Sequence, residues 1–256
     1  MDNSASSNWI EELANTLAQL AFLIGVIIVY FGTYYHADAA ALAALESTED
    51  VSVIEITKES DGADGWLFDG PGTDSALVFY PGAKVEAASY SPLLKEISLH
   101  GADCYLCRMP LNFALLGKNA AEDIRAVNKG NYGKWYIGGH SLGGVAAAMT
   151  ADDAEEEGNA AEWDGLILLA AYPTGELSTP VLSIYGSEDK VLNSEKYAET
   201  ESEGLWPDDF TEIIIEGGNH AQFGSYGEQK GDGRTGTDAA KQQKETAEAV
   251  SNWIKR

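Results

Sequence analysis

The sequence predicts an α/β domain with a mostly parallel sheet, and three features of the chain support this prediction. Short apolar segments alternate with stretches of helical periodicity, a pattern that places parallel strands side by side with helices on both faces. A glycine-rich turn that carries a serine joins one of these strands to an alanine-rich helix. The length of 256 residues, 45% of them hydrophobic, suits one such domain plus a short appendage.

An uninterrupted apolar run sets the N-terminal part of the chain apart from this domain. Residues 17–35 carry no charged side chain and are long enough to cross a bilayer core of about 30 Å as a helix. We expect a polar segment over 1–16, a transmembrane helix over 17–35, a linker over 36–50 and the α/β domain over 51–256. Residues 37–45 within the linker are alanine-rich and form either a short helix or part of the linker. The protein is therefore expected to be a single-pass membrane protein.

A cleavable signal peptide is the competing interpretation of the same run, because Ala37-Asp38-Ala39 follows it like a small-residue cleavage site. However, no Lys or Arg precedes the run, and the run exceeds the usual apolar core of about 7 to 15 residues. We therefore favour a retained anchor. The first basic residue of the chain is Lys58, so the positive-inside rule gives no orientation.

The domain is expected to open with a hairpin. Residues 51–57 are rich in β-branched side chains, and residues 65–69, which contain Trp66, Leu67 and Phe68, follow an Asp/Gly turn as the partner strand. A buried strand over 75–80 then leads into Pro81-Gly82-Ala83-Lys84. The next elements are a helix over 86–99 closed by Gly101, a strand over 103–109, a helix over 119–129 and the strand before Ser141.

After the helix that follows Ser141, the predicted elements are three strands and a closing amphipathic helix, over 164–170, 180–185, 211–215 and 238–254. Only the short stretch 171–179 joins the first two of these strands. No internal repeat is apparent.

The composition excludes some classes of ligand. A formal net charge of −25 repels phosphate backbones, so we expect no nucleic-acid partner. The two cysteines, Cys104 and Cys107, lie three residues apart in a predicted strand and so point to opposite faces, too far apart for a disulfide. No other Cys/His cluster completes a zinc site, and we expect packed thiols, no metal and no cofactor.

Ser141 is the candidate nucleophile. It lies in Gly139-His140-Ser141-Leu142-Gly143, a G-x-S-x-G sequence between a predicted strand and a predicted helix. This pattern places a serine on a sharp strand-to-helix corner, where the hydroxyl projects from the backbone and the flanking glycines allow close approach of the two elements.

His220 is the candidate base. A serine hydroxyl is a poor nucleophile until a base takes its proton, and that base is usually a histidine oriented by a carboxylate. Of the four histidines, His36 lies beside the apolar run, His100 at a helix end, and His140 points away from the serine in such a turn. His220 follows the last strand, at the sheet edge where α/β proteins place their sites.

The carboxylate is expected after a strand between the serine and the histidine. Asp189 lies in the loop after the strand over 180–185, and the neighbouring Glu188 is the alternative. An oxyanion also needs fixed N–H donors. We expect the backbone amide of Leu142 to be one, and we choose Ala83 in the loop after the third strand for the second.

These motifs together resemble the α/β-hydrolase family, in particular its small lidless members. The resemblance covers about residues 50–254 and is carried by the segments 79–85, 108–112, 138–144, 168–173, 184–189 and 217–227. It implies the α/β-hydrolase fold and a serine-hydrolase mechanism, and it does not supply a substrate. From the three candidate residues we expect a small-molecule acyl substrate. Pro81 departs from the wider superfamily, in which esterases and lipases often carry His before the oxyanion glycine.

The sequence leaves two classes of function open. The first is a membrane-anchored hydrolase that cleaves an ester or related acyl bond, with a peptidase or acyltransferase using the same three residues as variants. The second is a non-catalytic binding protein that keeps the fold. Neither the substrate nor the oligomeric state can be deduced from the residues.

Overall fold

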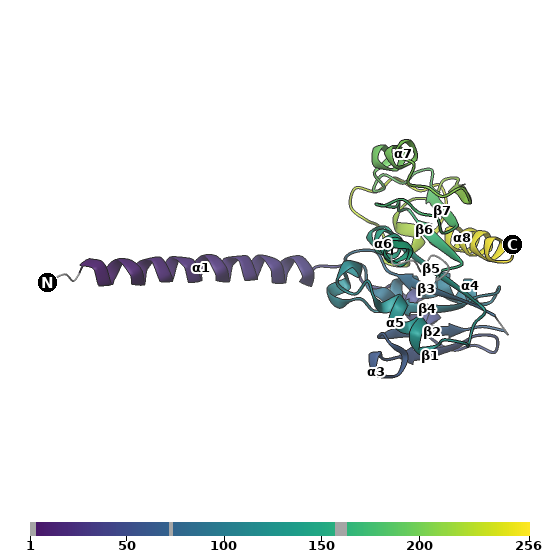
Figure 1. Cartoon of the computed structure of the whole chain (residues 1–256), viewed down its shortest axis with the longest axis horizontal. Helices are drawn as coiled ribbons and strands as arrows, with labels where there is room; N and C mark the ends of the chain where they lie inside the picture. The colour runs from purple at the N-terminus through teal and green to yellow at the C-terminus, as the bar shows by residue number, and fades with distance from the viewer. Residues whose placement is uncertain (1–3, 72–73, 157–162) are drawn as a thin grey trace. The chain divides into compact units, whose positions relative to one another are not determined.

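A computed structural model describes residues 4–71, 74–156 and 163–256 of the chain. The chain divides into two units between Tyr34 and Tyr35. The first unit is one long helix, α1 (Ser4–Gly32), and the second holds every other described helix and strand (Figure 1). Residues 12–32 of α1 have a mean hydropathy of 2.0 and the length needed to cross a membrane. A signal sequence near the N-terminus would meet the same criteria.

The second unit is built on one twisted sheet. The strands that the structure describes lie in the order β1-β2-β4-β3-β5-β6-β7-β8. All neighbours from β4 to β8 run parallel, whereas β1 and β2 are antiparallel to their neighbours. This confirms the predicted fold class and the predicted hairpin. The strands are β1 (Ser52–Ile56), β2 (Gly65–Asp69), β3 (Ser75–Tyr80), β4 (Asp103–Cys107), β5 (Lys134–His140), β6 (Gly165–Leu169), β7 (Val181–Gly186) and β8 (Phe210–Ile215).

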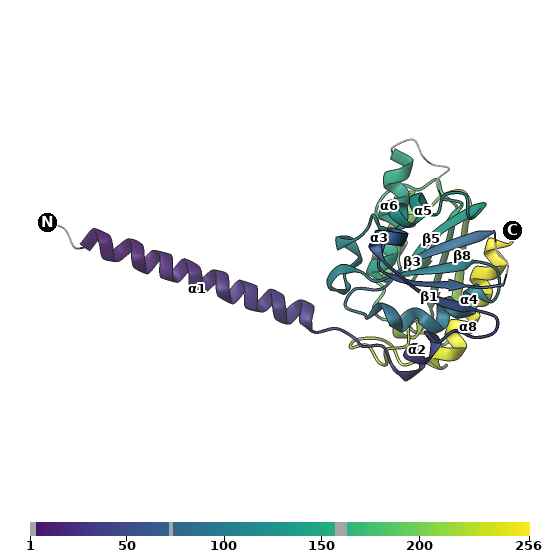
Figure 2. The same ribbon diagram turned by 90° about the horizontal axis from the view of Figure 1, so that it is seen from below.

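Helices cover both faces of the sheet (Figure 2). One face carries α2 (Ala39–Ala44), α4 (Ser91–Ser98) and α8 (Ala239–Ile254). The other carries α3 (Lys58–Asp61), α5 (Ala120–Val127) and α6 (Leu142–Glu156). The helix α7 (Ser194–Ser202) joins β7 through a hydrogen bond of 2.8 Å between the Tyr197 hydroxyl and Ser183 Oγ. The described single-turn 3-10 helices are η1 (Ala87–Tyr90), η2 (Pro110–Asn112), η3 (Ala114–Leu116) and η5 (Ala221–Phe223).

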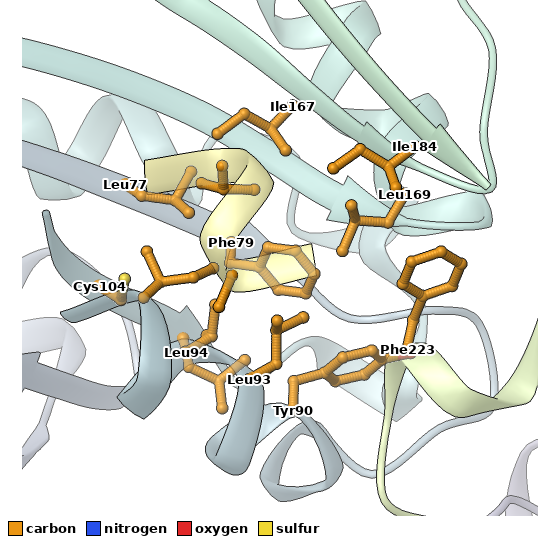
Figure 3. Close-up of a cluster of buried hydrophobic side chains, with 14 of the residues drawn as sticks. Leu77, Phe79, Tyr90, Leu93, Leu94, Cys104, Ile167, Leu169, Ile184 and Phe223 are labelled. Carbon is orange, nitrogen blue, oxygen red and sulfur yellow. The ribbon is translucent and has the colours of Figure 1, made fainter. Parts of the chain in front are cut away.

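Each face of the sheet has its own buried core, because alternate strand residues point to opposite sides. Leu77 and Phe79 of β3 pack with Leu93 and Leu94 of α4 on one face (Figure 3). Val78 lies on the other face, among the alanines of α6. Cys104 and Cys107 are buried free thiols in different cores, as the strand periodicity predicts.

Several elements differ from the sequence prediction in extent. The helix expected over 86–99 is a 3-10 turn followed by α4, and Pro92 stands in the first turn of α4. The stretch 36–50 contains α2, whose N-terminus is capped by the Asp38 carboxylate, so residues 37–45 take the helical one of their two expected forms. The polar helix α7 was not predicted, although Asn193 is an N-cap residue whose side chain accepts from the Lys196 N–H.

Candidate active site

Ser141 stands on a strained corner between β5 and α6. Its backbone φ is +53°, a left-handed conformation that is uncommon for a residue other than glycine. The corner is held by hydrogen bonds from the Ser141 N–H to the Leu169 carbonyl and from the Val145 N–H to the Ser141 carbonyl, at 2.9 and 3.1 Å. A strained serine between strand and helix is the arrangement that exposes a nucleophilic hydroxyl.

The glycines on either side of Ser141 are required by close backbone contacts. A Cβ at Gly139 would lie 2.5 Å from the backbone of Gly143. A Cβ at Gly143 would collide with the backbone carbonyl of Tyr80, at the end of β3. The glycines therefore let α6 approach both central strands, and Ser141 and Leu142 remain partly exposed above them.

His220 and Asp189 form a buried pair at the carboxyl ends of β8 and β7. Nδ1 of His220 lies 2.8 Å from Oδ2 of Asp189, and each side chain is only 1% exposed. Among the residues that the structure describes, Nε2 of His220 has no hydrogen-bond partner. A histidine held through Nδ1 by a carboxylate keeps Nε2 free to accept a proton, which is the geometry of a general base.

The loop after β7 presents Asp189, and not Glu188, to the histidine. The second carboxylate oxygen of Asp189 accepts the backbone N–H groups of Val191 and Leu192, each at 2.8 Å. These bonds fix the carboxylate while its other oxygen contacts His220. Glu188 contributes only its backbone N–H, which donates to the Gly218 carbonyl at 2.8 Å.

The structure places His140, the residue next to Ser141, against His220. The rings of His140 and His220 lie 4.4 Å apart, centroid to centroid, so the residue before the serine packs on the candidate base. No described hydrogen bond joins the Ser141 hydroxyl to Nε2 of His220. Such bonds are often long before a substrate is bound, and the unpartnered Nε2 remains available.

The backbone amides of Ala83 and Leu142 are the candidate donors for an oxyanion. Neither N–H takes part in a backbone hydrogen bond within the described part of the chain, and both residues are partly exposed. The Gly82 N–H, by contrast, donates to the Tyr90 hydroxyl at 3.0 Å and is buried. Ala83 is therefore the first residue of this loop whose N–H can reach a bound acyl oxygen.

The sequence did not reveal three residues that support the site. Tyr35 borders the candidate oxyanion loop, because its N–H donates to the Lys84 carbonyl at 2.7 Å and its carbonyl accepts from Glu86. Tyr90 contacts Gly82 and His140, and Asp232 contacts the loops that carry Asp189 and His220. Their residue types carried no distinguishing signal, since each acts on backbone groups or on a residue distant in sequence.

The chain belongs to the α/β-hydrolase family. The model of that family, described as "Alpha/beta hydrolase family", matches residues 76–245, which contain every candidate site residue. No curated protein matches the sequence.

Solved structures of hydrolases share the fold at low identity. A hyperthermophilic esterase from the archaeon Pyrobaculum calidifontis is 15% identical with a TM-score of 0.56, covering 94% of this chain and 97% of its own. A hormone-sensitive lipase from a metagenome library is 14% identical with a TM-score of 0.60, covering 84% and 89%. Dienelactone hydrolase from Anabaena variabilis is 15% identical with a TM-score of 0.58, covering 80% and 98%. These matches show the shared fold.

Proposed function

We propose that the protein is a membrane-anchored serine hydrolase that cleaves an ester or a related acyl bond. The observation that carries the proposal is the buried Asp189–His220 pair. It leaves Nε2 of His220 without a described hydrogen-bond partner, and the His220 ring packs on His140, the residue before the strained Ser141. The esterases and the lipase among the structural neighbours favour an acyl substrate.

The proposed reaction follows from these positions. Nε2 of His220 takes the Ser141 proton as Oγ attacks the acyl carbon, and Asp189 stabilises the imidazolium through Nδ1. The N–H groups of Leu142 and Ala83 bind the oxyanion of the tetrahedral intermediate. His220 then protonates the leaving alcohol, and a water molecule activated by the same nitrogen releases the acid from Ser141.

Contacts made by the residues that precede the suggested cleavage point favour a retained anchor. The Ala37 N–H donates to Glu86 Oε2 at 3.0 Å, and the Asp38 N–H donates to the Ser225 carbonyl at 2.9 Å. Cleavage near Ala40 would remove both, together with the pairing of Tyr35 beside the candidate oxyanion loop. The segment that follows the apolar helix thus packs as part of the second unit.

The anchor is tested by fractionation of the full chain and of a chain that begins at Thr33. We expect the full chain to sediment with membranes and to resist carbonate extraction, because α1 is apolar along most of its length. The shorter chain, which keeps Tyr35, should be soluble and active. A mature N-terminus near Ala40 would establish a secreted protein instead.

The reaction is tested with p-nitrophenyl acetate on the chain that begins at Thr33. We expect turnover by the wild type and a loss of about 10⁶-fold in kcat for Ser141→Ala. Cleavage of peptide anilides alone, or acyl transfer to an alcohol without hydrolysis, would replace the ester hydrolase with a peptidase or an acyltransferase. A wild type that turns over none of these substrates would favour a binding protein.

A further inference from the structure

One buried hydroxyl connects the candidate oxyanion loop to the serine corner. Tyr90 is the last residue of η1, the short helix that follows the candidate oxyanion loop, and it is fully buried. Its hydroxyl accepts the Gly82 N–H at 3.0 Å and lies 2.7 Å from Nδ1 of His140, the residue before Ser141. A Cβ at Gly82 would lie 2.9 Å from this hydroxyl and 3.0 Å from Nδ1, so glycine is needed for the three groups to meet.

The direction of these hydrogen bonds follows from the acceptors within reach. The amide of Gly82 can only donate, and Nδ1 of His140 is the acceptor that the described structure offers the buried Tyr90 proton, so we assign that proton to the bond with Nδ1. Nδ1 is then an acceptor, and neutral His140 carries its proton on Nε2. Burial lowers the pKa of His140, with the nearby His220 as a second cause, and burial raises the pKa of Tyr90. Both side chains are therefore neutral at neutral pH.

Through these hydrogen bonds, the Tyr90 hydroxyl connects the two chain segments that carry the candidate oxyanion donors. The Ala83 N–H follows Gly82 directly, and the Leu142 N–H is two residues beyond His140. The His140 ring also lies 4.4 Å from His220. We propose that the Tyr90 hydroxyl is a positioning group that fixes the spacing of the two oxyanion donors and the placement of the base. The proposal rests on the hydrolase function proposed above.

A purely structural role for Tyr90 is the alternative. Its ring packs 5.3 Å from that of Phe79 and lies beside Leu93 and Phe223 in the buried core (Figure 3). In that case the hydroxyl would serve only to satisfy a buried amide, and its loss would lower stability without changing the turnover of the folded protein. The two roles therefore differ in their effect on kcat.

The test compares Tyr90→Phe with Tyr136→Phe in the chain that begins at Thr33. Tyr136 is a matched control, because its buried hydroxyl also donates a hydrogen bond, here to the Ile254 carbonyl at 3.3 Å, away from the site. We expect Tyr90→Phe to lower kcat for p-nitrophenyl acetate by roughly 10- to 100-fold with KM within about 3-fold, since oxyanion donors act mainly in the transition state. The rate of fluorophosphonate labelling should fall in parallel.

Equal kcat values for the folded Tyr90→Phe and Tyr136→Phe proteins would overturn the positioning role and leave the hydrolase function standing. An inert wild type would overturn the hydrolase function itself. Should Tyr90→Phe fail to fold, His140→Phe and His140→Gln provide the comparison, because only the glutamine offers the Tyr90 hydroxyl an acceptor. We expect His140→Gln to exceed His140→Phe by about 10-fold in kcat, and equal values would contradict the proposal.

Discussion

The two halves of the candidate site are built from different kinds of group. The acid–base half uses the side chains of Asp189 and His220, which meet at 2.8 Å on the loops after β7 and β8. The proposed oxyanion half consists of the backbone amides of Ala83 and Leu142, which any residue other than proline could supply. The function of the acid–base half therefore depends on the identity of the residues that carry the reacting atoms. The function of the oxyanion half depends on the residues that hold its loop in place.

The supports of the two halves differ in the same way. Asp232 holds the acid–base half, because its carboxylate accepts the N–H of Ala221 at 2.8 Å and that of Lys190 at 3.3 Å. These are the residues directly after His220 and Asp189. The oxyanion half is held by Tyr90 and by Tyr35. Tyr35 lies near the N-terminus of the chain, whereas Asp232 lies near the C-terminus.

The largest effect on the acid–base half is expected from Asp189→Asn. The amide can keep the geometry but does not stabilise the imidazolium, so kcat should fall by about 10³- to 10⁴-fold. Glu188→Gln is the matched control and should retain wild-type kcat, because no described hydrogen bond involves the Glu188 side chain. Steady-state ester hydrolysis measures kcat for both variants. A larger loss of kcat in Glu188→Gln than in Asp189→Asn would assign the role of the carboxylate to Glu188.

A smaller effect is expected from Asp232→Asn. The amide offers one acceptor oxygen where the carboxylate offers two, so one of the N–H groups of Ala221, Lys190 or Gly233 meets an amide donor. We expect kcat/KM to fall by roughly 10-fold and the free energy of unfolding by about 1 to 3 kcal/mol. Both are measurable by ester hydrolysis and by denaturant unfolding.

Glu228→Gln provides the control for Asp232→Asn, since Glu228 is an exposed carboxylate on the same loop. It should leave both quantities unchanged. If Asp232→Asn lowers stability but leaves kcat/KM at the wild-type value, Asp232 holds the fold and not the acid–base half.

The smallest effect is expected from the length of the acyl chain. No helix occupies the stretch between β6 and β7 in the described structure, and Ser141, Leu142 and Ala83 are partly exposed. A fully buried methylene contributes about 0.8 kcal/mol, close to 4-fold in affinity, and an open site forgoes most of this. The catalytic efficiency kcat/KM should therefore change little from p-nitrophenyl acetate to p-nitrophenyl butyrate. A steady rise in kcat/KM up to the palmitate ester would contradict an open site.

The sequence predicted the sheet well because apolar strand segments and glycine turns are local signals. The strand over 75–80, the turn at Ser141 and the helix ending at Ile254 were all recognisable from such patterns. Nucleophile, base and carboxylate were proposed from residue type and chain order, with Asp189 as the chosen carboxylate and Glu188 as the alternative. Only the fold shows which of the two carboxylates contacts His220.

The supports of the site could not be predicted for a physical reason. Tyr90 acts through contacts with residues 8 and 50 positions away, and Tyr35 pairs with Val85, which lies beyond three intervening strands in the sequence. No local periodicity encodes such contacts, because they depend on how the sheet brings loop ends together. The alanine-rich residues 37–45 were compatible with a helix or a linker, since such a segment does not reveal its partners, and the structure shows the helix α2.

The central claim, that Ser141 is the reacting nucleophile, is tested most directly by mapping the site of covalent labelling. The chain that begins at Thr33 is treated with a fluorophosphonate, and peptide mass spectrometry locates the adduct. The account predicts an adduct on Ser141, none in Ser141→Ala, and a free energy of unfolding of that variant within about 1 kcal/mol of the wild type. An adduct on another residue, or equal labelling of Ser141→Ala, would contradict it.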